Sequence, residues 1–503
     1  MNEINPLFAI DFYKVDHRRQ YPEGTTEIYS NFTPRYYKKS HSLLPDYDGQ
    51  VVVYGIQGFI ESFFVEQWNR YFFKRPMRIA VGEYKDLIQD ALGIEDFDCS
   101  HLEALHELGF LPIRIKAINE GFRVPMGVPV LTIVNTLPEF FWLTNYLETA
   151  ISAGLWKAMT SATIAFEYKR LLMRYAKKTG GALSGVIFQA HDFSFRGMSG
   201  IEDAIVSGSA HLTSFQGTDC VPSICYLNKY YDANAHVSVV GSSVPATEHS
   251  VMCCTGKEGE FNTIKRLITE VYPEGIVSVV CDSYNFWECL SVYIVGLYAE
   301  IKARNGKVVI RPDSGNPVDI ICGDLNEKAG SPAFLGALQV LWDIFGGRIN
   351  AEGYKELDSH IGLIYGDAIT VDRASLILQI MEEKGFASSN IVFGVGSYTY
   401  QYVTRDTFGF AMKATSCVVN GKRHAIFKDP ITASDGNKKK SAKGLLSVDL
   451  DVETGRFKLF DNVTEDGETR GYLETVFEDG AMIPRTNLAE IRFNLQAELD
   501  SMD

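Results

Sequence analysis

The stretch KVVIRPDSGNPVD, residues 307–319, decides how we interpret the fold. A short run suited to a buried strand leads directly into Arg311, Pro312 and Asp313, and a Ser-Gly-Asn-Pro turn follows. Period-two geometry places Arg311 and Asp313 on the same side of an extended chain, where one can hold a phosphate and the other a hydroxyl group or Mg²⁺. A structural Arg–Asp pair beside a turn explains this stretch equally well when it is taken alone.

Further apolar segments share this pattern of a strand, a polar or glycine-rich break and a helical segment. They are residues 185–190, 211–215, 236–241, 276–281, 360–365 and 390–395. Continuous apolar strands that alternate with helices predict a parallel sheet, and this number of strands favours a closed or nearly closed (β/α) barrel. We therefore expect an α/β fold with a barrel-like domain over residues 182–400.

The chain on either side of this region has a different pattern of predicted strands and helices. Residues 1–181 mix strand-like and helical pieces, and residues 401–503 return to short strands and turns. We expect these two regions to pack together as a second, β-rich domain.

Composition excludes several classes of function. A formal charge of −15 opposes binding of nucleic acid or an anionic membrane through bulk electrostatics. Nine scattered cysteines without a CxxC pair indicate a reduced, cytoplasmic protein with neither a disulfide framework nor a zinc site. The N-terminus shows no secretory signal, and charged residues interrupt the most apolar stretch, so we expect no membrane span.

The loops that follow the predicted strands carry cations and glycines, which a barrel brings together on one face. Arg196, Arg311 and Arg405, with Lys413 and Lys428, supply enough positive charge for several phosphate groups, although each alone is more often a surface charge. Glycines at 366, 394 and 396 allow backbone N–H groups to approach a phosphate. Phe193 suits stacking on a flat ring, although a single loop phenylalanine is more often packing.

A set of motifs in these loops resembles the nicotinamide phosphoribosyltransferase family. The motifs are DFYKVDH (11–17), FWLTNYLET (141–149), HDFSFRG (191–197), FQGTDC (215–220), SVPATEHS (243–250), VVIRPDSG (308–315), YGDAITVD (365–372), FGVGSYTYQYVTRD (393–406) and FKDP (427–430). The resemblance covers most of the chain and implies a type II phosphoribosyltransferase fold. It identifies the polyphosphorylated ligand as phosphoribosyl pyrophosphate and the flat ring as nicotinamide, with nicotinamide mononucleotide and pyrophosphate as products.

The resemblance also implies roles for single residues around the ring. Phe193 resembles the aromatic residue that stacks on the pyridine ring. Tyr13 resembles its partner, supplied by the other subunit of a homodimer, with Asp11 close by. Ser243 and Ser278 resemble polar groups near the ring amide and the ribose.

A second set of roles concerns phosphate and ribose. Arg196, His249 and Arg311 resemble the pyrophosphate and ribose-phosphate contacts, and Asp313 resembles the residue that holds the ribose hydroxyls. The positions that resemble the phosphate and sugar cradle are Gly366, Asp367, Gly396, Ser397 and Arg405, with Arg35, Lys413 and Lys428 as cations donated across the dimer. Ser397 stands where the family has a third glycine, so a positive φ there would be strained and would weaken the phosphate contacts.

Asp219 bears on which base is used. A carboxylate accepts a hydrogen bond from a carboxamide but repels a carboxylate, so Asp219 favours nicotinamide over nicotinate. The alternative is that Asp219 only caps a helix that begins near Val221.

His249 resembles the histidine that the family phosphorylates at the expense of ATP, and Glu248 beside it is placed to orient the imidazole. The resemblance thus implies ATP as a stimulatory, hydrolysed cofactor, together with Mg²⁺ held mainly by the substrate pyrophosphate. Two rivals stay open: a nicotinate phosphoribosyltransferase, and a non-catalytic sugar-phosphate-binding protein on the same scaffold.

Overall fold

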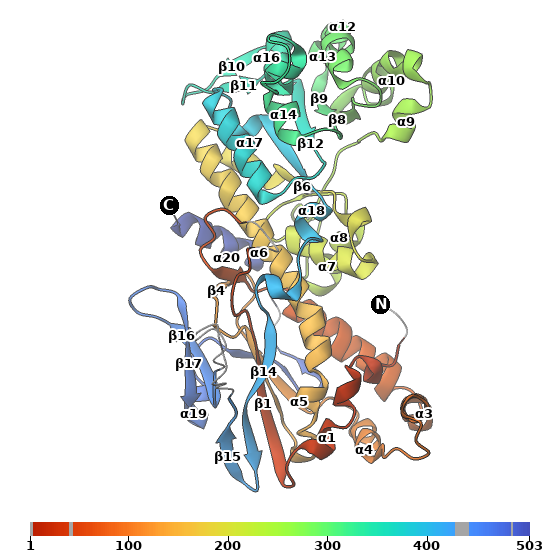
Figure 1. Cartoon of the computed structure of the whole chain (residues 1–503), viewed down its shortest axis with the longest axis vertical. Coiled ribbons are helices and arrows are strands. Elements are labelled where there is room, and N and C mark those ends of the chain that lie inside the picture. The colour runs from red at the N-terminus through yellow and green to blue at the C-terminus, as the bar shows by residue number, and fades with distance from the viewer. Residues whose placement is uncertain (1–3, 40–43, 428–441, 484–485, 503) are drawn as a thin grey trace.

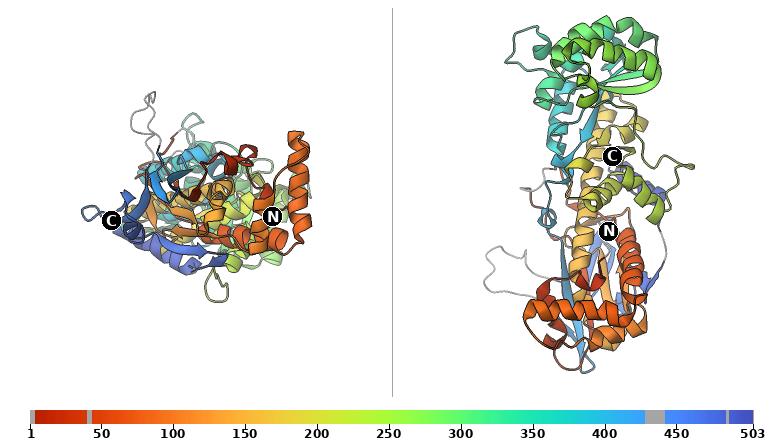
Figure 2. Two further views of the ribbon diagram at one scale, coloured as in Figure 1. Left: turned by 90° about the horizontal axis from the view of Figure 1, so that it is seen from below. Right: turned by 90° about the vertical axis from the view of Figure 1, so that its right-hand side faces the viewer.

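The computed structural model describes residues 4–39, 44–427, 442–483 and 486–502. The molecule is elongated, with a parallel sheet and its helices at one end and an antiparallel sheet at the other (Figure 1). Helix α6 (Glu148–Thr179) runs along the long axis between them, as the right-hand view of Figure 2 also shows. Its 32 residues are mostly buried, so α6 acts as a shared spine for both ends.

The parallel sheet has the strand order β7-β6-β13-β12-β9-β8. Its strands are β6 (Ala190–Asp192), β7 (Gly217–Thr218), β8 (Glu274–Val280), β9 (Asn305–Arg311), β12 (Ile361–Tyr365) and β13 (Ile391–Val395). Helices such as α7 (Ile201–His211), α8 (Val221–Tyr230), α16 (Ala337–Phe345) and α17 (Val371–Glu383) connect them. The expected barrel-like α/β fold is therefore confirmed.

Residues 242–246 bring the two edges of this sheet together. Isolated parallel bridges join Gly217 of β7 to Ser242, and Ala246 to Ser278 of β8. Backbone hydrogen bonds support both contacts, including Thr218 N to Ser242 O at 2.9 Å and Thr247 N to Ser278 O at 3.0 Å. This short extended segment fills the gap that the six-stranded sheet alone would leave.

Four of the predicted barrel strands are confirmed, at 276–281, 307–311, 360–365 and 390–395, each within one or two residues. Three are wrong. Residues 183–188 form a 3₁₀ turn ahead of β6, residues 211–215 complete α7 and its turn, and residues 236–241 lie outside the strands. Short apolar runs of buried residues look alike in strands, helix ends and turns, so periodicity did not separate them.

The antiparallel sheet has the order β15-β14-β1-β5-β3-β18-β19 and joins both flanking regions of the chain. Its strands are β1 (Thr25–Thr33), β3 (Ile113–Ala117), β5 (Leu131–Asn135), β14 (Ala411–Val419), β15 (Lys422–Ala425), β18 (Glu474–Glu478) and β19 (Ala481–Met482). Strand β1 pairs with β14 on one side and β5 on the other. The two flanking regions thus share one sheet across a large separation in sequence.

Smaller elements complete the structure. The two-stranded sheets are β2 (Gln50–Val52) with β4 (Arg123–Pro125), β10 (Gly347–Ile349) with β11 (Lys355–Leu357), and β16 (Leu445–Leu450) with β17 (Phe457–Val463). Helices α3 (Met77–Leu92), α4 (Ser100–Leu108) and α20 (Leu488–Ser501) lie outside the barrel. Within the described ranges, no helix is long and apolar enough to cross a membrane.

Candidate active site

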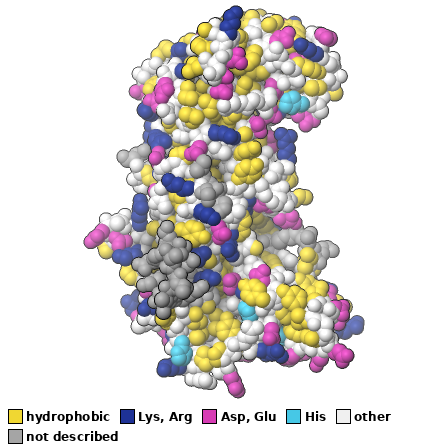
Figure 3. Space-filling view, in the orientation of Figure 1, with side chains coloured by type: hydrophobic (Ala, Val, Ile, Leu, Met, Phe, Trp, Pro, Cys, Tyr) yellow, Lys and Arg dark blue, Asp and Glu magenta, His cyan; other side chains and the backbone are white. Residues whose placement is uncertain are grey.

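A cavity of about 760 Å³ opens at the carboxyl ends of the barrel strands. Its lining comes from loops far apart in sequence: Phe193, Ser194, Phe195, Arg196, Gly197, Asp219, Ala246, Thr247, Glu248, Arg311, Asp313, Gly366, Asp367, Ala368, Gly396, Ser397 and Tyr398. Several Lys and Arg side chains lie across the middle of the face drawn in Figure 3, between the two sheets. The cavity thus brings together half of the predicted ring and phosphate residues, among them Phe193, Asp219 and Arg311.

Phe193 lies against two glycines that leave room for its ring. A Cβ added to Gly394 would lie 2.3 Å from Phe193 Cδ2, and one added to Gly366 would lie 2.8 Å from the same atom. The Arg311 guanidinium carbon is 5.9 Å from the ring centroid, within cation–π range. Any side chain at 366 or 394 would displace the aromatic ring.

Asp219 is held by two hydrogen-bond donors. His191 Nε2 donates to Asp219 Oδ1 at 2.9 Å, and Ser243 Oγ donates to the same oxygen at 2.7 Å. Burial by itself would raise the pKa of Asp219, but the bonds from His191 and Ser243 and the charge of Arg311 outweigh it and leave that pKa lowered. The carboxylate is therefore ionised at neutral pH. His191, one of its two donors, was not among the predicted site residues.

Asp219 does not cap helix α8. The residue at the N-cap is Cys220, and its side chain makes no capping hydrogen bond. The amide of Val221 instead contacts the backbone carbonyl of Asp219, at 3.2 Å. The capping interpretation of the Asp219 side chain is therefore wrong, and the carboxylate faces the cavity instead.

Arg311 ends β9 and Asp313 follows it, and both line the cavity, as the period-two spacing predicted. Arg311 donates through one terminal nitrogen to Thr247 O at 2.8 Å. Its Nε is buried and has no hydrogen-bond partner among the described residues. A partly buried, incompletely paired guanidinium at a cavity wall is suited to an anionic ligand.

His249 begins the short helix α9 (His249–Cys253), next to the lining residues Thr247 and Glu248. Its Nε2 lies 3.0 Å from Asp282 Oδ1. The other Asp282 oxygen accepts from Asp313 N at 2.9 Å and from Ser314 Oγ at 2.6 Å. Asp282 therefore ties the histidine to the loop of Asp313.

The prediction that Glu248 orients His249 is wrong. Glu248 accepts a hydrogen bond from Ser250 Oγ, whereas Asp282 meets the imidazole. Asp282 lies two residues after the end of strand β8, and its side chain is 3% exposed. Its position at a strand end is the signal that would have found it.

The glycine-rich phosphate loops are not strained where strain was expected. Ser397 begins the short helix α18 (Ser397–Tyr400) and is not among the residues with a positive φ. A Cβ added to Gly197 would lie 2.7 Å from Ser397 Cβ, so the loops of Arg196 and Ser397 pack directly together. In the neighbouring loop Ala368 has a φ of 53°, and Arg373 donates to its carbonyl.

Other predicted residues lie outside the cavity lining. Asp11 accepts from Thr149 Oγ1 at 2.6 Å, and Tyr13 is 63% exposed. Ser278 is buried on β8, and its Oγ has no hydrogen-bond partner within the described part of the chain. Ser243 reaches the cavity only through its bond to Asp219.

The remaining predicted cations gather near the antiparallel sheet instead. Arg35 donates through Nε to Gly409 O at 2.8 Å, and the exposed Arg405 lies 3.5 Å from Asp406. Lys413 is exposed on β14, opposite Asn31 of β1. One chain by itself does not bring these three to the cavity, and Lys428 lies outside the described residues.

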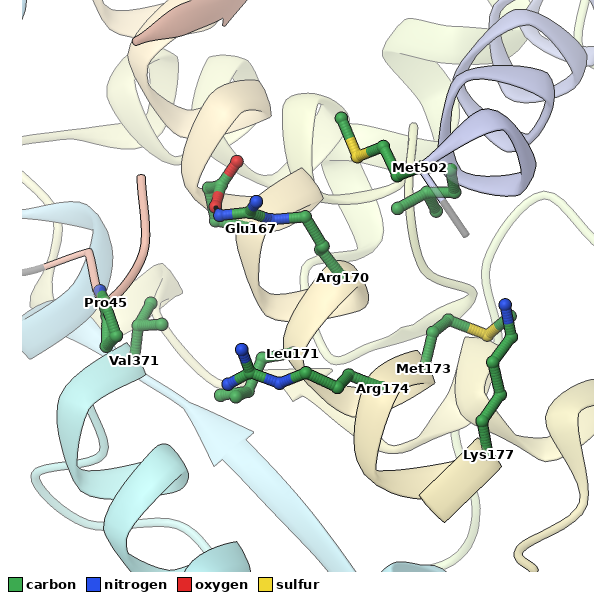
Figure 4. Close-up of a pocket in the computed structure, with 10 residues that line it drawn as sticks. Pro45, Glu167, Arg170, Leu171, Met173, Arg174, Lys177, Val371 and Met502 are labelled. Carbon is green, nitrogen blue, oxygen red and sulfur yellow. Dashed lines mark hydrogen bonds and ion pairs between the residues drawn. The ribbon is translucent and has the colours of Figure 1, made fainter. Parts of the chain in front are cut away.

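A second cavity of about 190 Å³ lies between α6, the start of α17 and the end of α20 (Figure 4). Arg170 and Arg174 line it, but Arg170 pairs with Glu167 and Arg174 pairs with Asp46. These cations are already neutralised by carboxylates of the chain itself. The larger cavity at the barrel strand ends is therefore the candidate active site.

Comparison with known proteins places these features in context. The Nicotinate phosphoribosyltransferase (NAPRTase) family matches residues 188–481, and the Nicotinamide phosphoribosyltransferase N-terminal domain matches residues 5–79. A nicotinamide phosphoribosyltransferase of Acinetobacter baylyi is 55% identical over 99% of this chain and 98% of its own length. One of Mycoplasma pneumoniae is 34% identical over 86% and 94%.

A solved structure shows the same fold at low sequence identity. The nicotinate-nucleotide pyrophosphorylase of Pyrococcus furiosus superposes with a TM-score of 0.57 at 14% identity, covering 100% of this chain and 98% of its own. At that identity the likeness concerns the fold alone.

Proposed function

The chain belongs to the nicotinamide phosphoribosyltransferases, and from this premise we propose that the barrel cavity joins nicotinamide to phosphoribosyl pyrophosphate. The pyridine nitrogen attacks C1 of the ribose, so an N–C1 bond forms while the C1–O bond to pyrophosphate breaks. The products are nicotinamide mononucleotide and pyrophosphate. The positive charge moves from the oxocarbenium-like sugar to the pyridinium ring.

The base half of the cavity holds the nucleophile. Phe193 stacks on the pyridine ring, and the ionised Asp219 accepts a hydrogen bond from the carboxamide. The same carboxylate repels the carboxylate of nicotinate, and a mismatched group of this kind strongly disfavours binding. This arrangement selects the amide and aims the ring nitrogen toward the sugar.

The phosphate half of the cavity holds the sugar donor. Arg311 and Arg196 neutralise the leaving pyrophosphate, and Asp313 contacts the ribose hydroxyls and supports the developing positive charge on the sugar. The backbones at Gly366, Asp367, Gly396 and Ser397 cradle the ribose phosphate. Positioning and electrostatics then suffice for the reaction without a covalent bond between the enzyme and the substrate.

Mg²⁺ fits this site as an ion carried chiefly by the substrate. The described residues contain no group of three or more metal-ligating side chains. Asp313 and Asp367 on the cavity wall offer the oxygen ligands that Mg²⁺ prefers. When bound, the ion neutralises charge on the pyrophosphate.

His249 is the residue that ATP phosphorylates in this proposal. The ring nitrogen bonded to Asp282 carries the proton, because a carboxylate only accepts, and this leaves the other nitrogen with a lone pair. That nitrogen attacks the γ-phosphorus of ATP, so an N–P bond forms, the bond to the bridging oxygen breaks and ADP leaves. Hydrolysis of the phosphohistidine regenerates His249.

A homodimer completes the proposed site. Tyr13, Asp11, Arg35 and Lys413 lie on the surface of one chain, outside its own cavity, which suits residues that serve a partner's cavity. Lys428, which lies outside the described residues, belongs to the same proposal. The nine free cysteines favour a reducing, cytoplasmic setting.

The observation that carries the proposal is Asp219, ionised and fixed by His191 and Ser243 within the cavity that Arg311 and Asp313 also line. The test is to incubate the purified protein with phosphoribosyl pyrophosphate, Mg²⁺ and either base, with and without ATP, and to measure the mononucleotide. We expect turnover of nicotinamide, a faster rate with ATP and little turnover of nicotinate. Absence of any mononucleotide would contradict the proposal.

The variant Asp219→Ser separates this function from that of a nicotinate phosphoribosyltransferase, the family whose profile matches residues 188–481. We expect kcat/KM for nicotinamide to fall by ~10²-fold and that for nicotinate to rise, because the charge that repels the acid has been removed. Indifference of both bases to this change would favour the nicotinate enzyme.

A further inference from the structure

His211 is fully buried behind the cavity, at the end of helix α7. Its Nε2 lies 3.1 Å from Gly217 O, and its Nδ1 lies 2.7 Å from Tyr400 OH. The ring also stacks on Phe215, with centroids 5.0 Å apart. This histidine contacts neither the base nor the phosphate directly, and the reaction proposed above does not use it.

The chemistry of its partners fixes the hydrogen-bond directions. A backbone carbonyl only accepts, so Nε2 carries the proton and donates to Gly217. Nδ1 is then the acceptor for the Tyr400 hydroxyl. Burial lowers the pKa of His211 to about 4, so the ring is neutral at physiological pH and these directions persist.

His211 thus bridges Tyr400 and Gly217, and each of these two residues leads to one half of the cavity. Tyr400 ends α18, the helix that begins at Ser397 in the phosphate loop. Gly217 lies on β7, two residues before Asp219, which contacts the base in the proposed mechanism. The path from the phosphate loop to Asp219 therefore crosses only two buried side chains, Tyr400 and His211.

The Gly217 end of the bridge is also confined from other directions. A Cβ at Gly217 would lie 2.8 Å from His191 Nδ1, and His191 in turn donates to Asp219. On its other side, Gly217 bridges to Ser242, the neighbour of Ser243. A shift of the Gly217 carbonyl is therefore passed to both donors that hold Asp219.

We propose that His211 is a positioning residue that couples the two halves of the cavity, so that sugar phosphate on the Ser397 loop tightens the binding of nicotinamide at Asp219. A ligand that orders α18 fixes Tyr400, His211 and Gly217, and the second ligand then meets a site that is already ordered. The inference rests on the proposed function for the identity of the ligands. Its test does not depend on turnover.

The experiment is calorimetric titration of nicotinamide into the protein with and without saturating ribose 5-phosphate, which cannot react with the base. We expect the sugar phosphate to lower the Kd for nicotinamide ~5- to 10-fold in the wild type. In Tyr400→Phe, which removes only the hydroxyl that donates to His211, this factor falls to between one and two. Failure of the proposed reaction would instead appear as absence of mononucleotide in the wild-type turnover assay.

Tyr168→Phe is the matched control. Tyr168 is also fully buried, and its hydroxyl lies 2.9 Å from Thr399 Oγ1 on the same helix α18, but it comes from α6 and leads away from β7. A thermal melt of both variants measures the structural cost, which we expect to be similar. Tyr168→Phe should keep the wild-type coupling factor.

Three results would overturn the proposal. Ribose 5-phosphate leaves nicotinamide affinity unchanged in the wild type, Tyr400→Phe keeps the full coupling factor, or Tyr168→Phe loses it equally. The first result needs no variant, so the proposal is testable even if Tyr400→Phe does not fold.

Discussion

The two halves of the cavity are built in different ways. In the phosphate half, β9 carries Arg311 and pairs with β8 over the whole of 274–280 against 305–311. In the base half, β6 and β7 pair only through His191 with Gly217 and Asp192 with Thr218. The long β8–β9 ladder thus holds Arg311, whereas side-chain hydrogen bonds from His191, Ser243 and His211 hold Asp219 and Gly217 in the base half.

This difference indicates where each half is vulnerable. The backbone of the phosphate half is fixed by its strands, so substitutions there remove charge without moving the loop. The base half depends on individual side chains and on close contacts with glycine, so conservative changes shift its geometry. Four predictions test this contrast, from the largest expected effect to the smallest.

Arg311→Leu should have the largest effect, and most of that effect should fall on the sugar donor. We expect kcat/KM for phosphoribosyl pyrophosphate to fall by ~10²- to 10³-fold, because a preorganised cation opposite the leaving group is lost. The melting temperature should change little, since β9 keeps its ladder. Arg348→Leu, an exposed arginine on β10, is the control and should keep full activity.

Gly394→Ala should impair the base half almost as strongly. The added methyl would lie 2.3 Å from the Phe193 ring, so the ring must move. We expect the KM for nicotinamide to rise by ~10- to 100-fold, measured at saturating sugar donor. Gly82, on α3 outside the barrel, is the control: a Cβ there meets nothing within 4 Å, so Gly82→Ala should behave like the wild type, and equal damage from both changes would contradict the contrast.

The same contrast explains what the sequence could predict. The long runs at 276–281 and 307–311 are β-branched and became β8 and β9, so Arg311 and Asp313 were found from strand position alone. The two- and three-residue strands β7 and β6 leave no periodic signal, and two of the wrong strand predictions lie beside them. Phe193, Asp219 and His249 came from motif resemblance instead.

The residues that were missed act through contacts made only in three dimensions. Asp282 and His191 each hold a predicted side chain, across 33 and 28 positions of sequence respectively. No sequence feature near either residue indicates which side chain it contacts. The roles of Arg35 and Lys413 likewise depend on a contact outside the single chain, because their proposed ligand lies in the cavity of another subunit.

Asp282→Asn tests the junction between the phosphate loop and His249. An amide keeps the shape and can still accept from Asp313 N, but it loses the charge that orients and stabilises the imidazole. We expect ATP to stimulate the variant ~10-fold less than the wild type, while the rate without ATP falls only ~2-fold. Rates should be compared with and without ATP, and unchanged stimulation would remove Asp282 from the ATP step.

His191→Phe should have the smallest and most specific effect. The pKa of Asp219 is held below its ordinary value, so the carboxylate that is proposed to accept from nicotinamide stays ionised as pH falls. Its charge is lost only below the ordinary carboxyl range. Phenylalanine removes the donor at 2.9 Å while burial, which raises the pKa of Asp219, remains. The loss of nicotinamide binding should therefore begin at a higher pH in the variant, with KM raised ~3-fold at neutral pH.

The control for this change is Ser243→Ala, which removes the other donor to the same oxygen. It should move the pH profile in the same direction but by less, because His191 supplies the stronger lowering of the Asp219 pKa. KM for nicotinamide measured from neutral pH down through the ordinary carboxyl range distinguishes the variants, with KM for the sugar donor as the internal reference. If His191→Phe altered the sugar-donor KM as much as the base KM, the two halves would not be held independently, and the contrast between ladder and side-chain support would fail.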